Sequence, residues 1–273
     1  MERTKRKDRL GALAQILIEN PNRLHTLGEF CEKFNTAKST ISEDVELLRA
    51  SIAEYGFGRI ETVPGAAGGA RYRPIPTEEQ TRKTLQRLAA RLSEPGRMLP
   101  GGFLYNSDIS TEPEVAERIG QILAARYYSA APDLVLTMET KGIPIAMMTA
   151  RMLNVPLVIA RRDSRAYEGS AVKINYVAGD NGSRIETMAL ARRAVKAGQR
   201  ALIIDDFMKG GGTLQGMVDM MHEFQAQVVG VGVMIATAEP AEKRVKGAHS
   251  LLVLRSYDMA TGAGVVTPAD EYL

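Results

Sequence analysis

The stretch that most constrains this chain lies at residues 201–214. It begins with the apolar run ALII, which has the length and β-branching of a buried parallel strand. The run stops at Asp205–Asp206, and after a short loop come the consecutive glycines Gly210–Gly212. We expect these glycines to adopt positive φ and Thr213 to cap a helix over residues 214–224. The order predicts a strand, a tight loop and a helix.

The predicted loop is suited to a phosphate group. Glycines leave backbone N–H groups uncovered, and a helix N-terminus favours an anion. Asp205 and Asp206 would repel a bare phosphate, so they fit a ligand that also carries hydroxyl groups or a bound metal ion. A sugar phosphate has both features. The alternative is a glycine run that merely lets the chain turn, and the adjoining acids disfavour it.

Composition limits the class of protein. A length of 273 residues indicates two domains, and 45% hydrophobic with 25% charged residues is typical of a globular protein. No apolar run is long enough to span a membrane, and no signal-peptide core follows the basic N-terminus, so we expect a soluble, cytoplasmic protein. A lone Cys31 and the scattered His25, His222 and His249 predict neither a disulfide nor a resident metal site.

The N-terminal part predicts short helices joined by tight turns. Apolar residues recur at helical spacing over residues 10–18. Thr26 and Glu29 form a capping box at the start of a second helix. A third helix follows a turn at residues 35–38 and ends near Gly56. This pattern is typical of a helix-turn-helix.

A hairpin follows these helices. Alternating strands at residues 59–63 and 70–73 flank a tip of small side chains, PGAAGG, which is typical of the wing of a winged helix. Five of the first nine residues are basic, which suits either a solvated tail or an arm on DNA phosphates. The alternative for the whole segment is a dimerisation bundle with a flexible turn. The residues that we expect to contact DNA are Arg3, Lys5, Arg6, Lys38, Ser39, Thr40, Ser42, Arg59, Gly65, Ala66, Ala67, Gly68 and Arg71.

Beyond the prolines at residues 74–76 the pattern changes. A linker helix is expected at residues 78–92, and strands and helices then alternate as in an α/β domain with a parallel sheet. We therefore divide the chain into a DNA-binding domain, 1–74, and an effector domain, 75–273. The further expected elements are strands at 103–105, 133–138 and 155–162, a returning strand at 173–176, and helices at 112–128, 143–153 and 185–196.

Three more features adjoin the expected strand ends. Thr140, Lys141 and Gly142 offer a hydroxyl, an ammonium and amides to an anion, although on their own they are equally a plain turn. Phe103 and Phe207 either stack on a purine base or fill the core. Arg184 directly precedes the helix that we expect from residue 185. Its side chain either reaches a phosphate or lies in solvent.

The central stretch resembles the phosphoribosyl pyrophosphate (PRPP) motif of type I phosphoribosyltransferases. The resemblance implies that Asp205 and Asp206 hold the ribose hydroxyls and that residues 209–213 hold the 5-phosphate. It also makes residues 139–142 the pyrophosphate loop and residues 161–171 the flexible hood loop. The acid Glu139 in that loop is a departure that we expect to weaken binding or to favour a metal-bridged mode.

Lys209 is a second departure. Several enzymes of this type have a general-base Asp or a small Ala at that position, whereas a cationic Lys cannot accept a proton. We therefore expect a motif that binds its ligand without catalysing a reaction.

Along nearly its whole length the chain resembles the purine operon repressor family of Gram-positive bacteria. The segments that carry the resemblance are TVPGAAGGARY, PGGFLY, TKGIP, EGSAVKINYV and LIIDDFMKGGGT. The resemblance implies a phosphoribosyltransferase-fold domain that does not catalyse and that binds PRPP, and also ppGpp, in one pocket. The residues that we expect to contact the effector are Phe103, Tyr105, Thr140, Lys141, Gly142, Asp205, Asp206, Phe207, Met208, Lys209, Gly210, Gly211, Gly212 and Thr213.

The resemblance further implies a homodimer that carries two winged helices onto double-stranded operator DNA. PRPP, with or without Mg²⁺, then weakens DNA binding, and a competing nucleotide opposes the release. The sequence thus predicts a repressor of purine biosynthesis genes that is not an enzyme. Two alternatives stay open: an active purine phosphoribosyltransferase with an added DNA-binding domain, and a scaffold that binds PRPP but not DNA.

Overall fold

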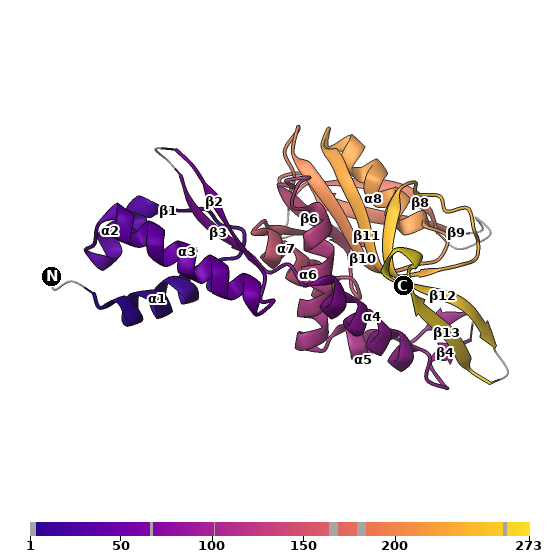
Figure 1. Cartoon of the computed structure of the whole chain (residues 1–273). Coiled ribbons are helices and arrows are strands. Elements are labelled where there is room, and N and C mark those ends of the chain that lie inside the picture. The colour runs from indigo at the N-terminus through magenta and orange to yellow at the C-terminus, as the bar shows by residue number, and fades with distance from the viewer. Residues whose placement is uncertain (1–3, 66–67, 101, 164–168, 179–183, 259–260) are drawn as a thin grey trace. The chain divides into compact units, whose positions relative to one another are not determined.

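The computed structural model describes residues 4–65, 68–100, 102–163, 169–178, 184–258 and 261–273 (Figure 1). The chain forms two compact units, of which the first comprises Met1–Thr77 with Arg151–Asn154 and the second comprises Glu78–Ala150 and Val155–Leu273. No helix among the described residues is long and apolar enough to cross a membrane.

The first unit is a small helical domain with a β-sheet. Its helices are α1 (Arg6–Glu19), α2 (Leu27–Phe34) and α3 (Lys38–Glu54), and its strands are β1 (His25–Thr26), β2 (Arg59–Val63) and β3 (Gly69–Arg73). The strand order is β1-β3-β2, with β2 and β3 forming an antiparallel hairpin (Figure 1). The close approach of β3 to β1 requires glycine, because a Cβ on Gly69 would lie 1.9 Å from the carbonyl oxygen of His25.

The core of this unit comes from the predicted helical faces. Leu13, Phe30, Ile41 and Val45 are buried together with the hairpin residue Tyr72. The Thr26 hydroxyl accepts a hydrogen bond from the amide of Glu29 (3.2 Å), so the predicted helix cap is present.

The basic N-terminal residues from Arg6 to Arg9 belong to a helix and do not form an extended arm. Helix α1 already begins at Arg6, and Arg9 is buried with 3% exposure. Its Nε lies 2.5 Å from Oδ2 of the fully buried Asp44, and Arg6 pairs with the other oxygen of the same carboxylate. Arg9 therefore joins α1 to α3 and is not part of a solvated arm, whereas Arg6 remains 55% exposed and its contact with DNA stays a prediction.

The second unit is an α/β domain whose predicted fold class is confirmed. Its helices are α4 (Glu78–Leu92), α5 (Ser107–Ser110), α6 (Pro113–Tyr127), α7 (Ile143–Leu153), α8 (Gly212–Glu223) and the 3₁₀ helix η2 (Asp270–Tyr272). Its strands are β4 (Met98–Leu99), β5 (Phe103–Leu104), β6 (Leu134–Met138), β7 (Leu157–Ala160), β8 (Ala171–Ala178), β9 (Arg184–Ala191), β10 (Arg200–Met208), β11 (Gln227–Thr237), β12 (Ala248–Asp258) and β13 (Ala263–Pro268).

The central sheet has the order β13-β12-β11-β10-β6-β7 (Figure 1). All neighbours pair in parallel except β12 and β13, which are antiparallel. Strand β10 lies between β11 and β6 and is buried along almost all of its length, as the continuous apolar run predicts. The carboxyl ends of β10 and β6 therefore lie side by side.

Helices cover the sheet and complete the core. Helix α8 packs with the β8–β9 hairpin over one cluster of apolar residues, which includes Met188, Met217 and Val233. Helix α6 lies on β11, where Gly230 leaves room for the ring of Tyr127 and the Tyr127 hydroxyl donates to the carbonyl of Val231 (2.9 Å).

The helix expected at residues 185–196 is wrong. Residues 184–191 form the strand β9, which pairs with β8 over its whole length. The sequence of this segment places apolar residues at spacings that suit either a helix or a strand, and the antiparallel partner decides between them.

Candidate functional site

The two aspartates of the central stretch lie near the carboxyl end of β10. The strand continues past them to Met208 and does not stop at the acids as the sequence suggested. Asp205 and Asp206 are only 7% and 6% exposed, and the Asp206 amide donates to Oδ1 of Asp205 (3.0 Å). Burial raises the pKa of the Asp205 carboxyl well above its ordinary value, and the neighbouring Asp206 carboxylate raises it further. The pair is an acceptor-rich site with little solvation.

The glycine-rich loop follows this pair and leads into α8. Gly211 adopts the left-handed conformation (φ 79°) at the helix N-cap. Gly212 touches β8, because a Cβ there would lie 2.0 Å from the carbonyl oxygen of Val177. Two details differ from the expectation. Of the three glycines only Gly211 has positive φ, and Thr213 lies inside the first turn of α8 instead of capping it.

A second loop, residues 139–142, meets the first at the adjacent end of β6. Thr140 and Lys141 are exposed, and the Glu139–Thr140 peptide bond is cis. Gly142 is buried, and a Cβ on it would lie 2.4 Å from Oδ1 of Asp205. Glycine thus lets the start of α7 approach the acid pair, and the two loops face one site.

The carboxylate of Glu139 is held at the edge of this site. It accepts hydrogen bonds from the side chain of Arg161 (3.2 Å) and from the amide of Arg162 (2.8 Å). Because this acid has a cationic partner, its repulsion of an anionic ligand is smaller than the sequence suggested.

Both loops line an open cleft of about 400 Å³. Its lining residues are Met138, Glu139, Thr140, Lys141, Arg162, Tyr176, Glu186, Asp205, Asp206 and Thr213. Lys141 and Arg162 bring positive charge to it, and the acid pair supplies acceptors. Cationic groups and buried carboxylates in one cleft can bind a ligand that has both anionic and hydroxyl groups.

The remaining expected effector residues lie in different surroundings. Phe103 is 62% exposed and Tyr105 44% exposed, so neither fills the core. Phe207 is half-buried. The side chain of Met208 is buried in the apolar core, so only its backbone faces the loop.

Sequence reasoning missed three polar side chains at this site: Tyr176 and Glu186, which line the cleft, and Asn106, which contacts the acid pair. The Tyr176 hydroxyl donates to the carboxylate of Glu186 (2.8 Å), and burial together with this bond raises the pKa of Tyr176 to about 12. Glu186 also pairs with Arg184 (3.1 Å). The amide of Asn106 donates to Oδ2 of Asp206 (2.9 Å). Nothing in the linear sequence marks contacts between residues so far apart.

The first unit carries the expected DNA-contacting residues. Lys38, Ser39 and Ser42 are exposed in the first turns of α3, whose first turn contains no acid, and Thr40 is half-buried. Lys5, Arg59 and Gly65 are also exposed.

Other expected DNA contacts are less accessible or not described. Gly68 is buried, Arg71 pairs with Glu61 (3.1 Å), and Arg6 pairs with Asp44. Arg3, Ala66 and Ala67 lie outside the described residues.

Family models match both units. Residues 5–74 match the N-terminal domain of the bacterial purine repressor, and residues 106–269 match the phosphoribosyl transferase domain. The chain is 42% identical over 255 residues to the purine biosynthesis transcriptional repressor PurR of Bacillus subtilis, covering 93% of this chain and 89% of that protein. The chain belongs to the PurR family of purine biosynthesis transcriptional regulators.

The relatives include both a repressor and an activator of purine biosynthesis genes. The chain is 41% identical over 256 residues to the purine biosynthesis transcriptional activator PurR of Lactococcus lactis subsp. lactis, covering 94% of each. Among solved structures, adenine phosphoribosyltransferase from Rhodothermus marinus superposes with a TM-score of 0.53 at 19% identity, covering 64% of this chain and 99% of that one. This likeness concerns the fold of the second unit.

Proposed function

We propose that this protein is a repressor of purine biosynthesis genes whose operator binding is weakened by PRPP. The observation that supports the ligand is the cleft in which buried Asp205 and Asp206 meet a glycine-rich helix start and the cations Lys141 and Arg162. PRPP carries ribose hydroxyls for the carboxylates and phosphates for the amides and cations. The expected effector residues of both loops are proposed as its contacts.

Mg²⁺ is proposed to enter with the ligand. No group of three or more His, Cys, Asp or Glu side chains suited to a metal ion occurs among the described residues. The two carboxylates can nevertheless share an ion that the diphosphate of the ligand already holds. The ion neutralises charge between the ligand and the acids.

A guanine or adenine nucleotide with a diphosphate group, such as ppGpp, is proposed to compete for the same cleft. Its phosphates need the same amides and cations as PRPP. Exposed Phe103 and half-buried Phe207 offer ring faces for its base. A competitor that does not weaken operator binding would oppose the action of PRPP.

The first unit is proposed to bind operator DNA in the cytoplasm, as part of a homodimer. The exposed polar and basic groups at the start of α3 suit base and phosphate contacts, and the β2–β3 hairpin is the wing. The proposed domain boundary lies between residues 74 and 75.

We further propose that the effector domain does not catalyse. Lys209 occupies the position at which several related enzymes have a general base, and an ammonium cannot accept a proton. Incubation with PRPP, Mg²⁺ and each purine base tests this proposal. Nucleotide formed at a useful rate would favour the active phosphoribosyltransferase instead.

The test of the regulatory proposal is a titration of purine-operon upstream DNA with and without PRPP. We expect specific binding that PRPP weakens. A parallel transcription assay on the same promoter should show fewer transcripts when the protein is added. Absence of specific binding, or binding that ignores PRPP, would refute the mechanism, and more transcripts would make the protein an activator.

A further inference from the structure

The acid pair is connected to residues outside the cleft through Asn106. This side chain is only 1% exposed, and its Nδ2 donates to Oδ2 of Asp206 (2.9 Å). Its Oδ1 is buried and has no hydrogen-bond partner among the described residues. Burying an amide oxygen without a partner costs free energy. The side chain keeps this orientation because its nitrogen donates to Asp206.

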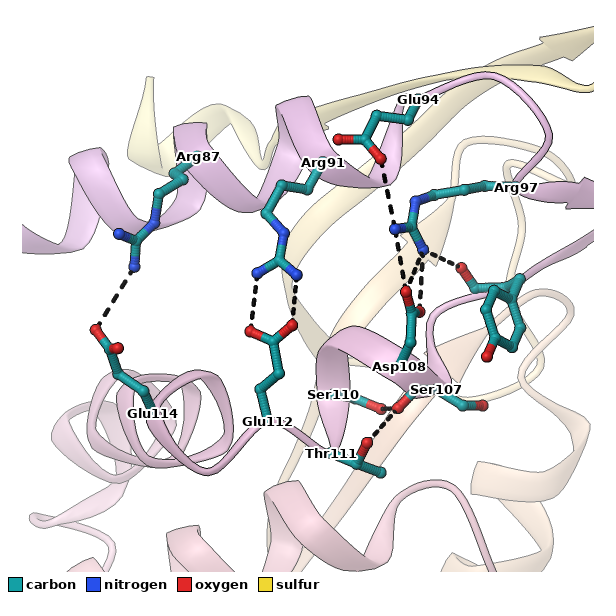
Figure 2. Close-up of polar contacts among 11 residues, drawn as sticks. Arg87, Arg91, Glu94, Arg97, Ser107, Asp108, Ser110, Thr111, Glu112 and Glu114 are labelled. Atoms are coloured by element: carbon teal, nitrogen blue, oxygen red, sulfur yellow. Dashed lines mark hydrogen bonds and ion pairs between the residues drawn. The ribbon is translucent and has the colours of Figure 1, made fainter.

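Arg97 contacts a residue on either side of Asn106 in the chain, and Figure 2 shows its pair with Asp108. Its Nη1 donates to the carbonyl oxygen of Tyr105 (3.2 Å) and to the carboxylate of Asp108 (3.0 Å), and the side chain is only 14% exposed. The hydrogen bond between the two groups lowers the pKa of Asp108 and raises that of Arg97. Arg97 thus joins the 105–108 segment, which contains Asn106, to the stretch of chain that follows α4.

Two arginines of α4 continue the set of contacts (Figure 2). Arg91 donates from both terminal nitrogens to the two oxygens of Glu112 (3.0 and 2.5 Å), which is a bidentate pair. One turn earlier Arg87 pairs with Glu114 (3.7 Å). Both acids flank the start of α6.

The opposite face of α4 is apolar. Leu85, Leu88 and Leu92 are buried, and the helix packs against β13. Helix α4 begins at Glu78, directly after Thr77, which is the last residue of the N-terminal segment of the first unit. Its position in the second unit is thus set by apolar packing on one face and by arginine–carboxylate pairs on the other.

We propose that Asn106 is a positioning residue for Asp206 and that Arg97 and Arg91 carry its displacement to α4 when a sugar diphosphate binds. The inference rests on the proposed function. A ligand whose hydroxyls or metal ion occupy the acceptor sites of Asp206 competes with the donor of Asn106. The ligand and the operator then favour different positions of the 105–108 segment and of α4, which is the condition for coupling between them.

The first experiment breaks and restores the Arg91–Glu112 pair. The quantity measured is the ratio of operator Kd with saturating PRPP and Mg²⁺ to operator Kd without them. R91E should reduce this ratio to about a fifth of the wild-type ratio or less, since couplings of this kind span about 5- to 150-fold. The charge-swapped double variant R91E/E112R should restore it.

A matched control lies on the same helix. Lys83 pairs with Glu79 within α4 (2.6 Å) and does not reach α6, so K83E should keep the wild-type ratio. Because PRPP is saturating, a variant that only binds PRPP more weakly still shows the full change in operator Kd. Operator binding without PRPP shows whether each variant is folded. If R91E binds operator but responds to PRPP as the wild type does, the proposal is overturned.

The second experiment tests Asn106 itself. N106A removes the donor with which the ligand competes for Asp206, so PRPP should bind as tightly as to the wild type or more tightly, and the response of operator binding should be abolished. N106D also removes the donor at neutral pH, so its response should be absent as well. N106Q keeps an amide donor and should retain part of the response, whereas a purely structural role would make the longer side chain as damaging as alanine.

The outcomes separate this inference from the proposed function. A wild-type protein that ignores PRPP would refute the proposed function. A responsive wild type with an equally responsive N106A, or with an N106Q no more responsive than N106A, would refute the positioning role alone.

Discussion

At the residue scale, the buried acid of the central strand costs stability. Asp205 lies beside Asp206 in a buried strand, where burial and the neighbouring Asp206 carboxylate both raise the pKa of Asp205. The folded protein therefore binds more protons at this position than the unfolded chain does at pH values above the ordinary carboxyl pKa. The contribution of this carboxyl group to the free energy of unfolding consequently falls as the pH rises through that range.

The first prediction follows from this sign. D205N keeps the side-chain shape and the acceptor for the Asp206 amide but removes the buried charge. We expect the ligand-free variant to be more stable than the wild type at pH 7.5 by about 0.5–2 kcal/mol, and the gain to shrink at pH 5. Urea unfolding at both pH values measures it. Lower stability at pH 7.5, or a gain that is larger at pH 5, would contradict the assignment.

The buried Arg9–Asp44 pair leads to a second prediction. D44A leaves the guanidinium of Arg9 without its carboxylate in the core between α1 and α3. We expect the first unit to lose about 3–5 kcal/mol of stability in urea unfolding. The control is E46A, which breaks the exposed pair with Arg49 on the same helix and should cost less than about 1 kcal/mol. Equal effects of the two variants would exclude the structural role.

Sequence reasoning failed at this pair for a physical reason. In the sequence Arg9 is one of five basic residues near the N-terminus that suit a solvated tail or an arm on DNA, and nothing beside Asp44 marks it as a buried partner. Only packing of α1 on α3 brings them together, and no local pattern encodes a contact over that separation.

At the element scale, α3 and the α8 loop present the proposed binding groups. Local signals predicted both correctly: the capped helices and the small-residue hairpin in the first unit, and the strand, loop and helix around the glycines in the second. Where an element depends on a distant partner the prediction failed, as for residues 184–191, which the pairing with β8 makes a strand.

A third prediction concerns α3. Lys38 is exposed in its first turn, and as a phosphate contact it should contribute to affinity without regard to sequence. K38A should weaken binding to operator and to unrelated DNA alike and reduce the slope of log K against log salt by about 1. R49A, an exposed arginine on the same helix paired with Glu46, is the control and should leave the slope unchanged. A loss confined to the operator would instead indicate a base contact.

A fourth prediction concerns the loop before α8. The close contact between Gly212 and the carbonyl of Val177 leaves no room for a side chain. G212A must displace α8 or β8 and should weaken PRPP binding at least about tenfold, since small displacements of binding groups have large effects. Operator binding without PRPP should be unchanged. Calorimetric PRPP binding equal to that of the wild type would show that this contact is not needed for the cradle.

At the scale of the whole molecule, a phosphoribosyltransferase-type domain is joined to a purine-repressor-type domain in one chain. The sequence motifs were sufficient to predict both and to place the acid pair at the carboxyl edge of a parallel sheet. They did not predict the contacts that surround it. Asn106 and the Tyr176–Glu186 pair come from other strands and loops, and only the fold brings them to Asp206 and to the cleft.

The central claim is that occupancy of the cleft and binding of the operator are linked in free energy. Linkage is reciprocal, so the operator must change the affinity for PRPP by the same factor by which PRPP changes the affinity for the operator. The most direct measurement is the Kd of PRPP with Mg²⁺ for the free protein and for the protein saturated with operator DNA. The account predicts a weaker PRPP affinity on the operator, by at least about fivefold. Equal affinities in the two states would contradict it.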